Sequence, residues 1–345
     1  GTLRGTNGFG QYWDGNITLG AHSTIKADYN LIIDGVISGS SKNLTKTGNG
    51  NLLLRGNNTY TGSTTISAGT LTLSGSGNLG AGSYAGAIVN NGTFKFDTSA
   101  NLISTGVISG SGVVNVSGAG IFEPTATNTY TGGTIIDGGK IAAKTDRNFG
   151  ANPSSDDPDN VLLRNTGTIY FGSVNSSNSL GHVNFGYNNN RGIYLESGQH
   201  NFIDGSGGNG RNKIYSVISG VGGVTYGKVG NKTMTIYSAN TYTGDTRFNY
   251  TTGSNNGVHI ANANAWKYST VYLNSTKTDV RKGWTVVSGG SINFGGLAGD
   301  ATDWRWQNKK VTFGYNNQDT TFSGTISRYN NSGYDLVKVG TGTTT

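Results

Sequence analysis

The protein has 345 residues and a formal net charge of +7, with 58 glycines, no cysteine and only 12% charged residues. This composition excludes an all-α protein, because helices are built mainly from Ala, Leu, Glu and Lys. It also excludes a disulfide framework and cysteine-based zinc sites. No apolar run approaches the ~18 residues of a transmembrane helix, so no transmembrane segment is expected in this chain.

A short phrase recurs along the chain: Gly, then Thr or Ser, then two apolar residues that flank one polar residue. Apolar residues two positions apart predict a β-strand with one buried face. The flanking Gly, Asn and Ser residues predict turns. The phrase occurs at 69–73, 92–96, 167–171 and 290–294, with a looser form at 192–195.

The interval between these phrases indicates the architecture. The distance is 23 residues from Gly69 to Gly92 and 25 residues from Gly167 to Gly192. This interval holds no amphipathic stretch for a crossover helix, but it fits one coil of a β-solenoid. Uncharged Asn, Thr and Ser suit such stacking, since like charges in register would repel. A β-sandwich or a propeller is the alternative.

A longer repeat overlies the short phrase. Val-Ile-Ser-Gly begins at Val36, Val107 and Val217, and each copy is followed by Asn-Thr-Tyr-Thr-Gly. The residues that define the repeat are Tyr60, Gly62, Tyr130, Gly132, Tyr242 and Gly244. We expect one continuous solenoid over 1–345, an elongated single domain. Its repeat units lie near 36–80, 107–150 and 217–250, with a truncated unit from 325.

The residues 44–54, followed by 58–62 and 69–71, resemble the autotransporter-associated β-strand repeat, also called the passenger-associated transport repeat. The resemblance is looser at 121–150 and at 226–244, and it is truncated at 336–343. It implies an all-β protein with a right-handed parallel β-helix (β-solenoid). It also implies an extracellular location, at the outer cell surface of a Gram-negative-type bacterium.

Residues 151–160 concentrate carboxylates and prolines and are expected to form a projecting loop. Asp156, Asp157 and Asp159 are candidate calcium ligands, because hard cations bind clustered oxygens. The alternative is a solvated loop without a metal.

Trp304, Arg305 and Trp306 form the strongest candidate for a surface contact. In a strand, alternation places the two tryptophans on one face and Arg305 on the other. If the two rings are exposed, they can stack on glycans or insert into a partner. If they are buried, they form a layer of the core.

The charge of the chain is unevenly distributed. Residues 1–172 carry 10 basic and 10 acidic side chains, whereas residues 173–345 carry 15 and 8. No run of Lys or Arg exceeds two residues, so nucleic acid is not an expected partner.

The sequence predicts a structural or adhesive surface protein of autotransporter-passenger type, with no catalytic residue, no cofactor and no metal site assigned. Its expected partners are other copies of itself or a host or environmental surface, including glycans. Two alternatives stay open. One is a self-assembling fibre or surface-layer subunit that stacks through the solenoid ends. The other is a polysaccharide-active β-helix enzyme, a chemistry that uses paired carboxylates.

Overall fold

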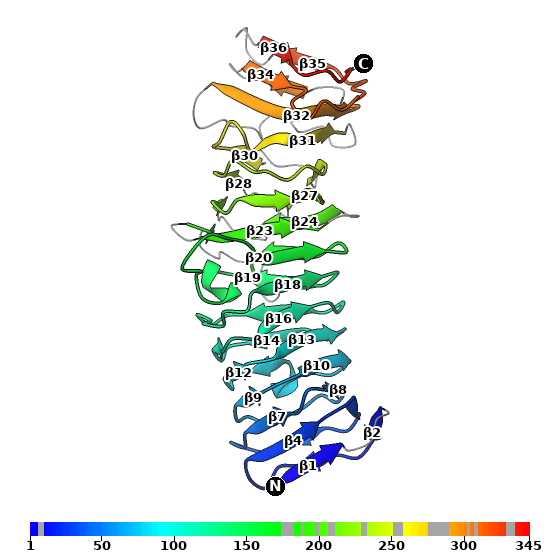
Figure 1. The fold of residues 1–345 in the computed structure, drawn as a ribbon, viewed down its shortest axis with the longest axis vertical. Coiled ribbons are helices and arrows are strands. Elements are labelled where there is room, and N and C mark those ends of the chain that lie inside the picture. The colour runs from blue at the N-terminus through cyan, green and yellow to red at the C-terminus, as the bar shows by residue number, and fades with distance from the viewer. Residues whose placement is uncertain are drawn as a thin grey trace. The chain divides into compact units, whose positions relative to one another are not determined.

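A computed structural model describes most of the chain as coils of short β-strands (Figure 1). The chain divides into two compact units. The first comprises Gly1–Pro153, Asn160–Leu162 and Gly167–Ile169, and the second comprises Ser154–Asp159, Leu163–Thr166 and Tyr170–Thr345. The described residues are 1–5, 10–173, 183–187, 190–196, 200–205, 211–228, 233–250, 258–274, 290–301, 304–306, 310–328 and 335–345.

The strands of the first unit pair in parallel from coil to coil. One sheet contains β1 (Thr2–Gly5), β4 (Ser23–Ala27), β7 (Leu44–Thr47), β9 (Thr64–Ile66), β12 (Ile88–Asn90) and β15 (Ile108–Ser109). A second contains β2 (Gln11–Trp13), β5 (Leu31–Ile33), β8 (Asn51–Leu54), β10 (Thr70–Gly75), β13 (Thr93–Thr98), β16 (Val113–Val116) and β18 (Thr134–Asp137). A third contains β11 (Ser83–Tyr84), β14 (Leu102–Ser104), β17 (Ile121–Pro124) and β19 (Lys140–Ala143), while β3 (Ile17–Thr18) pairs with β6 (Ile37–Ser38). Two short 3₁₀ turns, η1 (Gly80–Gly82) and η2 (Asp146–Phe149), interrupt the coils.

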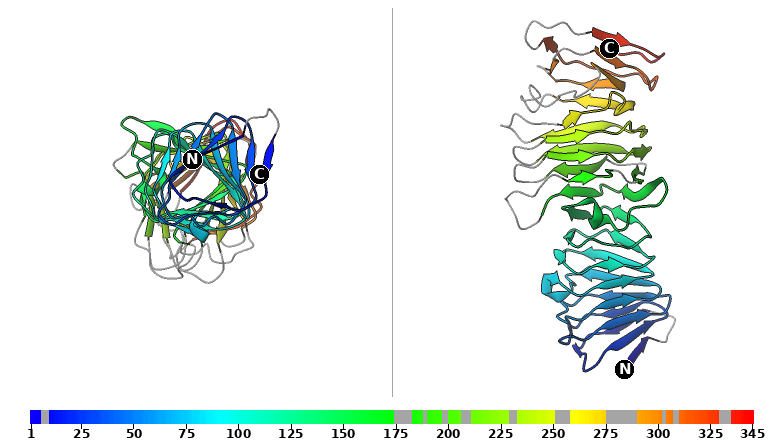
Figure 2. Two further views of the ribbon diagram at one scale, coloured as in Figure 1. Left: turned by 90° about the horizontal axis from the view of Figure 1, so that it is seen from below. Right: turned by 90° about the vertical axis from the view of Figure 1, so that its left-hand side faces the viewer.

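The second unit has the same parallel organisation (Figure 2, right). One sheet contains β22 (Asn184–Phe185), β25 (Arg211–Ile214), β28 (Thr233–Ile236) and β30 (Val258–Ile260). Another contains β24 (His200–Gly205), β27 (Gly223–Lys228), β29 (Thr246–Tyr250), β31 (Trp266–Leu273), β32 (Ser291–Gly299), β34 (Lys310–Phe313) and β36 (Asp335–Lys338). β23 (Arg191–Leu195) pairs with β26 (Ile218–Gly220), and β33 (Trp304–Trp306) pairs with β35 (Ile326–Arg328). β20 (Asp157–Arg164) and β21 (Thr168–Phe171) contain residues of both units.

The core consists of apolar ladders that run from coil to coil. In the first unit, one ladder places Leu31, Leu52, Leu71, Phe94 and Val114 in register, so that one coil takes 19 to 23 residues. Each of these side chains is 5% exposed or less. The alternation within the short phrases therefore does mark a buried face, and the predicted all-β parallel solenoid is confirmed. A sandwich of antiparallel sheets is wrong, because the strand pairs of the described residues are parallel.

The asparagine of Asn-Thr-Tyr-Thr-Gly connects three successive coils. The Asn58 side-chain oxygen accepts the backbone N–H of Ile37 at 2.9 Å, and its amide nitrogen donates to the carbonyl of Asn78 at 2.9 Å. Asn128 makes the corresponding bonds with Ile108 and Asn148, and Asn240 makes them with Ile218 and Ala265. All three asparagines are at most 2% exposed. We call these three side chains the asparagine bridges.

The tyrosine of the same motif is bonded within its own coil, and the glycine allows two coils to approach. The Tyr60 hydroxyl shares a hydrogen bond with Thr64, and Tyr130 and Tyr242 repeat this contact with Thr134 and Thr246. Burial raises the pKa of Tyr60 and of Tyr242 well above the ordinary value, so both hydroxyls stay neutral. A Cβ on Gly62 would lie 2.2 Å from the carbonyl oxygen of Lys42, so only glycine allows this approach of two coils.

Lys46 occupies an inward position of β7 and is fully buried. Its ammonium donates to the carbonyls of Gly48 and Ala68, at 2.5 and 2.9 Å. Burial lowers the pKa of Lys46 to about 8, and the negative charge of Asp28 partly opposes this effect. Two carbonyl partners therefore compensate only part of the cost of burying the charge.

Replacing an asparagine bridge is expected to destabilise the protein far more than replacing an exposed asparagine. Asn128→Ala leaves the buried N–H of Ile108 and the carbonyl of Asn148 without these partners, at a cost of about 3 kcal/mol in unfolding free energy. Asn91→Ala is the matched control, because Asn91 is exposed and accepts the N–H of Ser111. Urea unfolding followed by circular dichroism gives both values. Equal losses in the two variants would contradict the role of the bridge.

The stability of the protein is expected to rise with pH between about 8 and 10. The Lys46 pKa is about 8 in the folded chain and 10.5 in the unfolded chain, so the unfolded chain holds more protons in this range and folding is favoured as pH rises. Between pH 7.5 and 9.5 the gain is about 2 kcal/mol. Above pH 10 the buried tyrosines act in the opposite sense, because the pKa of Tyr84 is raised to about 12. In Lys46→Met, the unfolding free energy measured by urea denaturation should no longer rise between pH 7.5 and 9.5. If this variant keeps the same rise, Lys46 is not its cause.

Candidate functional site

Strand β31 presents a group of cationic, aromatic and polar side chains on the outer face of its sheet. Trp266, Val271 and Leu273 point inward and are at most 3% exposed. The register to β32 shifts between Trp266 and Thr270, which marks a bulge. The bulge leaves two successive residues, Lys267 and Tyr268, outside the core. The β31 surface consists of Lys267, Tyr268, Thr270 and Tyr272 with His200, Asp245, Arg247, Tyr315, Asn316 and Gln318 from neighbouring coils. Thr270 is only 2% exposed, so its neighbours cover it.

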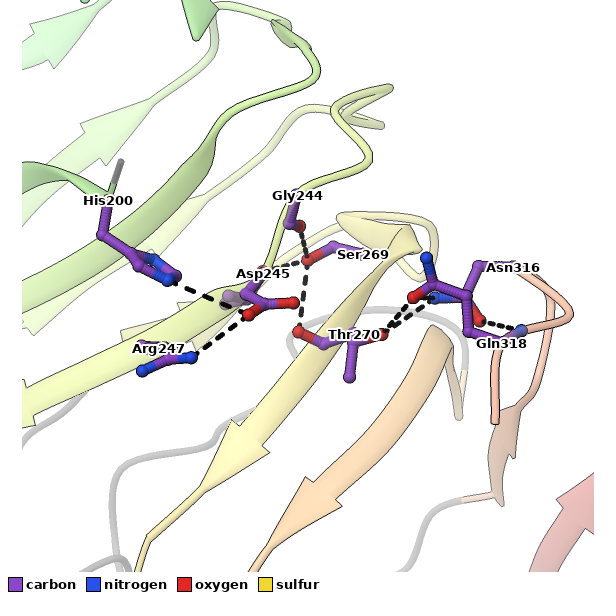
Figure 3. Close-up of polar contacts among 9 residues, drawn as sticks. His200, Gly244, Asp245, Arg247, Ser269, Thr270, Asn316 and Gln318 are labelled. Atoms are coloured by element: carbon purple, nitrogen blue, oxygen red, sulfur yellow. Dashed lines mark hydrogen bonds and ion pairs between the residues drawn. The ribbon is translucent and has the colours of Figure 1, made fainter. Parts of the chain in front are cut away.

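The first part of the β31 surface is a charged group. The Arg247 Nη2 atom lies 3.2 Å from Asp245 Oδ2, and the guanidinium lies 4.6 Å from the centroid of the Tyr272 ring. His200 Nε2 lies 3.8 Å from the same carboxylate oxygen of Asp245 (Figure 3). Gly223 lies in register with His200, and a Cβ there would lie 2.7 Å from the imidazole. Glycine at this position therefore leaves room for the histidine ring.

His200 is uncharged over most of the physiological pH range. Burial lowers its pKa and the nearby Arg247 lowers it further, while Asp245 acts in the opposite direction. Asp245 therefore mainly balances the charge of Arg247. Because the ion pair and the ring contact act together, the guanidinium has a defined position on the surface.

The second part of the β31 surface is a neutral hydrogen-bonded triangle. The Asn316 amide nitrogen donates to Thr270 Oγ1 at 2.9 Å and to Gln318 Oε1 at 3.0 Å. The Thr270 hydroxyl donates to the same Gln318 oxygen at 3.1 Å (Figure 3). Gly296 pairs with Thr270, and a Cβ on it would lie 2.9 Å from Thr270 Oγ1. The residues of the triangle thus come from two coils that meet over a glycine.

The third part is Lys267, whose ammonium lies between two tyrosines. The Nζ atom is 5.5 Å from the ring centroid of Tyr268 and 5.1 Å from that of Tyr315. Tyr268 is 41% exposed. Both distances are in the range of cation–π attraction. Among the residues whose positions are described, no carboxylate lies within ion-pair distance of Lys267.

A second aromatic group lies outside strands β22, β25 and β28. Tyr215 and Tyr237 stack with ring centroids 4.5 Å apart, and Tyr187 meets Tyr215 edge to face at 4.7 Å. Lys213 lies 5.8 Å from the centroid of Tyr237. In this group the rings contact each other from coil to coil, so their faces mainly stabilise the stack. The β31 surface is therefore the stronger candidate for a binding site.

The structure places the predicted site residues as follows. Trp304–Trp306 form strand β33, but their side chains lie outside the described residues. In the segment 151–160, residues 151–156 lie outside strands and Asp157 and Asp159 lie in β20. No group of three or more His, Asp or Glu side chains that could hold a metal ion occurs in the described part of the chain.

The sequence reasoning missed the β31 surface. Its residues lie on coils that are separated by 20 or more positions, and none of them is among the residues that define the repeat. The available signal was local: Trp266, Lys267 and Tyr268 alternate as in the other strands, but Ser269 and Thr270 follow as two successive polar residues before Val271. Such a break predicts a bulge or an irregular coil, which a close reading of 266–272 could have found.

Comparison with known proteins identifies the repeat. A family described as the passenger-associated-transport-repeat matches residues 44–73, 114–143 and 228–249. These three ranges contain the three asparagine bridges, and each range lies within one of the three predicted units 36–80, 107–150 and 217–250. No solved structure matches the chain.

One curated relative is similar over a longer stretch. The chain is 31% identical over 252 residues to a protein of Brucella suis biovar 1 (strain 1330) named "Adhesin BmaC autotransporter". The similarity covers 61% of this chain and 7% of the relative, so the chain spans a small part of that protein's length. In the described residues, no helix is long and apolar enough to cross a membrane. The three matched ranges show that the chain contains passenger-associated transport repeats, and the similarity to part of an autotransporter adhesin supports an autotransporter passenger repeat protein.

Proposed function

We propose that this chain is part of a secreted passenger that acts as an adhesin at the outer surface of a Gram-negative bacterium. The observation that carries the proposal is the similarity to an autotransporter adhesin across 61% of the chain. The repeat itself supports the passenger role but does not distinguish an adhesin from other passengers.

The fold supports a binding role for its outer face. The inside of each coil is filled by side-chain ladders such as Leu31, Leu52 and Leu71, which leaves the solvent-facing side for a partner. The β31 surface combines tyrosine rings, a fixed guanidinium and neutral amides. Aromatic residues and arginine are the side chains that contribute most to binding in protein interfaces. We therefore place the adhesive contact on the β31 surface.

The same surface favours adhesion over the alternative of a polysaccharide-active enzyme. Glycoside hydrolysis uses a pair of carboxylates on either side of the scissile bond. The β31 surface has a single carboxylate, Asp245, and this group pairs with Arg247. The name of the relative also favours a binding role.

An adhesion assay tests this function. Beads coated with the protein are added to epithelial monolayers and to plastic, and bound beads are counted after washing. Arg247→Ala combined with Tyr272→Ala should lower adhesion at least about fivefold, since it removes an arginine and an aromatic contact. The matched control is Arg55→Ala with Tyr29→Ala, which removes an ion-paired arginine and an exposed tyrosine from the first unit.

Two results would contradict the proposal. If beads carrying the unmodified protein adhere to neither surface, the chain is not adhesive. If the control variant loses as much adhesion as the Arg247/Tyr272 variant, the contact is not made by the β31 surface. Circular dichroism of each variant confirms that the fold is retained.

A further inference from the structure

Lys267 carries a positive charge that its surroundings hold in place but do not neutralise. The two tyrosine rings attract the ammonium through their π faces, yet they contribute no negative charge. The other charged side chains of the β31 surface are Asp245, Arg247 and His200, and Asp245 interacts with both of the other two. The ammonium of Lys267 is thus available to an anion from solution.

The β31 surface offers a second cationic centre beside a tyrosine. Arg247 lies over Tyr272, and Tyr272 is five positions along the strand from Lys267. Five residues of a strand extend at most about 16 Å. The neutral triangle of Thr270, Asn316 and Gln318 lies between the two centres. Along β31 the surface therefore presents Lys267 with its two tyrosines first, then the neutral triangle, and then Arg247 with Tyr272.

The charge of the chain agrees with an anionic ligand. Residues 173–345 carry 15 basic and 8 acidic side chains, whereas residues 1–172 are balanced. The cation–π contacts of the described residues also lie in this part of the chain, between Lys213 and Tyr315. An excess of positive charge raises the local concentration of anionic partners and speeds their association.

We propose that the β31 surface binds an acidic polysaccharide, with the Lys267 ammonium pairing with a carboxylate of a uronic acid unit and the rings of Tyr268 and Tyr315 contacting the sugar. The inference rests on the proposed adhesive function, for which it names the ligand class. A repeating polymer presents the same anionic group at intervals, which suits two cationic centres on one surface, Lys267 of β31 and Arg247 of β29. The neutral amides match the hydroxyl groups of the sugars between them.

A sugar polymer fits this arrangement better than an acidic peptide or a nucleic acid. The C–H faces of pyranose rings pack on tyrosine rings, while the hydroxyl groups bind Asn and Gln amides. Nucleic acids are bound by rows of cations along a phosphate backbone. The β31 surface instead has Asp245 beside one of its two cationic centres, which reduces the attraction for a densely charged polymer.

The test is binding of purified protein to immobilised polygalacturonate, measured by surface plasmon resonance, with neutral dextran and poly-L-glutamate as comparison surfaces. Polygalacturonate should bind, and dextran and poly-L-glutamate should bind at least about tenfold more weakly. Lys267→Gln should weaken binding to polygalacturonate about tenfold, the loss of one charge-assisted contact. Lys310→Gln is the matched control, because Lys310 is an exposed lysine of β34 in the same unit.

Two further variants separate a sugar contact from simple charge attraction. Tyr268→Ala should weaken binding to polygalacturonate although it leaves the net charge unchanged, and Tyr268→Phe should restore it because the ring is retained. Equal binding to poly-L-glutamate, an equal loss in Lys267→Gln and Lys310→Gln, or full binding by Tyr268→Ala would each overturn the proposal.

The polygalacturonate experiment and the adhesion assay can fail independently of each other. Polygalacturonate binding that depends on Lys267, together with beads that do not adhere, would refute the adhesive function but keep the ligand class. Adhesion that depends on Arg247 and Tyr272, without any polygalacturonate binding, would keep the function and refute the ligand class.

Discussion

The structure depends on one recurring interaction, the buried asparagine side chain that joins a coil to the coil before it and the coil after it, as Asn58, Asn128 and Asn240 do. In a parallel solenoid the strands are short, so each corner leaves backbone N–H and C=O groups without a strand partner. Burying such groups unpaired costs free energy. The asparagine bridges solve this problem because one amide side chain both accepts and donates, as Asn128 does between Ile108 and Asn148.

The composition of the chain follows from the need to stack coils closely and to pair the polar groups that stacking buries. Stacked coils need small residues where backbones approach, and a Cβ on Gly62 would collide with the carbonyl of Lys42. They also need uncharged polar groups at buried positions, such as Thr64, whose hydroxyl bonds to both Tyr60 and Tyr84. Lys46 is one exception, as are Glu123 and Arg191. The pKa of Lys46 is lowered to about 8 because burial disfavours its charge. Function is thereby left to the outward positions, where the β31 surface lies.

The sequence was sufficient to predict the elements that repeat. The alternation at Leu71 and Leu73 gave the buried face of a strand correctly, and the spacing of Gly69 and Gly92 gave the length of a coil. The Asn-Thr-Tyr-Thr-Gly motif marked Asn58, which is buried and bonded between coils, and Tyr60, which is buried and bonded to Thr64 within its own coil. The alternation is local and the motif occurs three times, so both can be recognised in one sequence without knowledge of how the coils stack.

The binding surface could not be predicted in the same way. Arg247 meets Tyr272, and Lys267 meets Tyr315, only after the coils are stacked in a particular register. The bulge in β31 changes that register and turns Lys267 and Tyr268 outward. For Lys46 the local pattern gave two opposite indications, since alternation with Leu44 predicts burial whereas its charge predicts exposure. Side-chain contacts between distant coils settle such positions, and these contacts are absent from the sequence pattern.

The central claim is that the asparagine bridges hold the coils together, and amide hydrogen exchange tests it most directly. The N–H groups of Ile37, Ile108 and Ile218 donate to side chains instead of to a neighbouring strand. If the bridges carry the stacking, these amides should exchange as slowly as those of the core strands, such as Leu71 and Phe94. Exchange at the rate of the exposed turns would contradict the account.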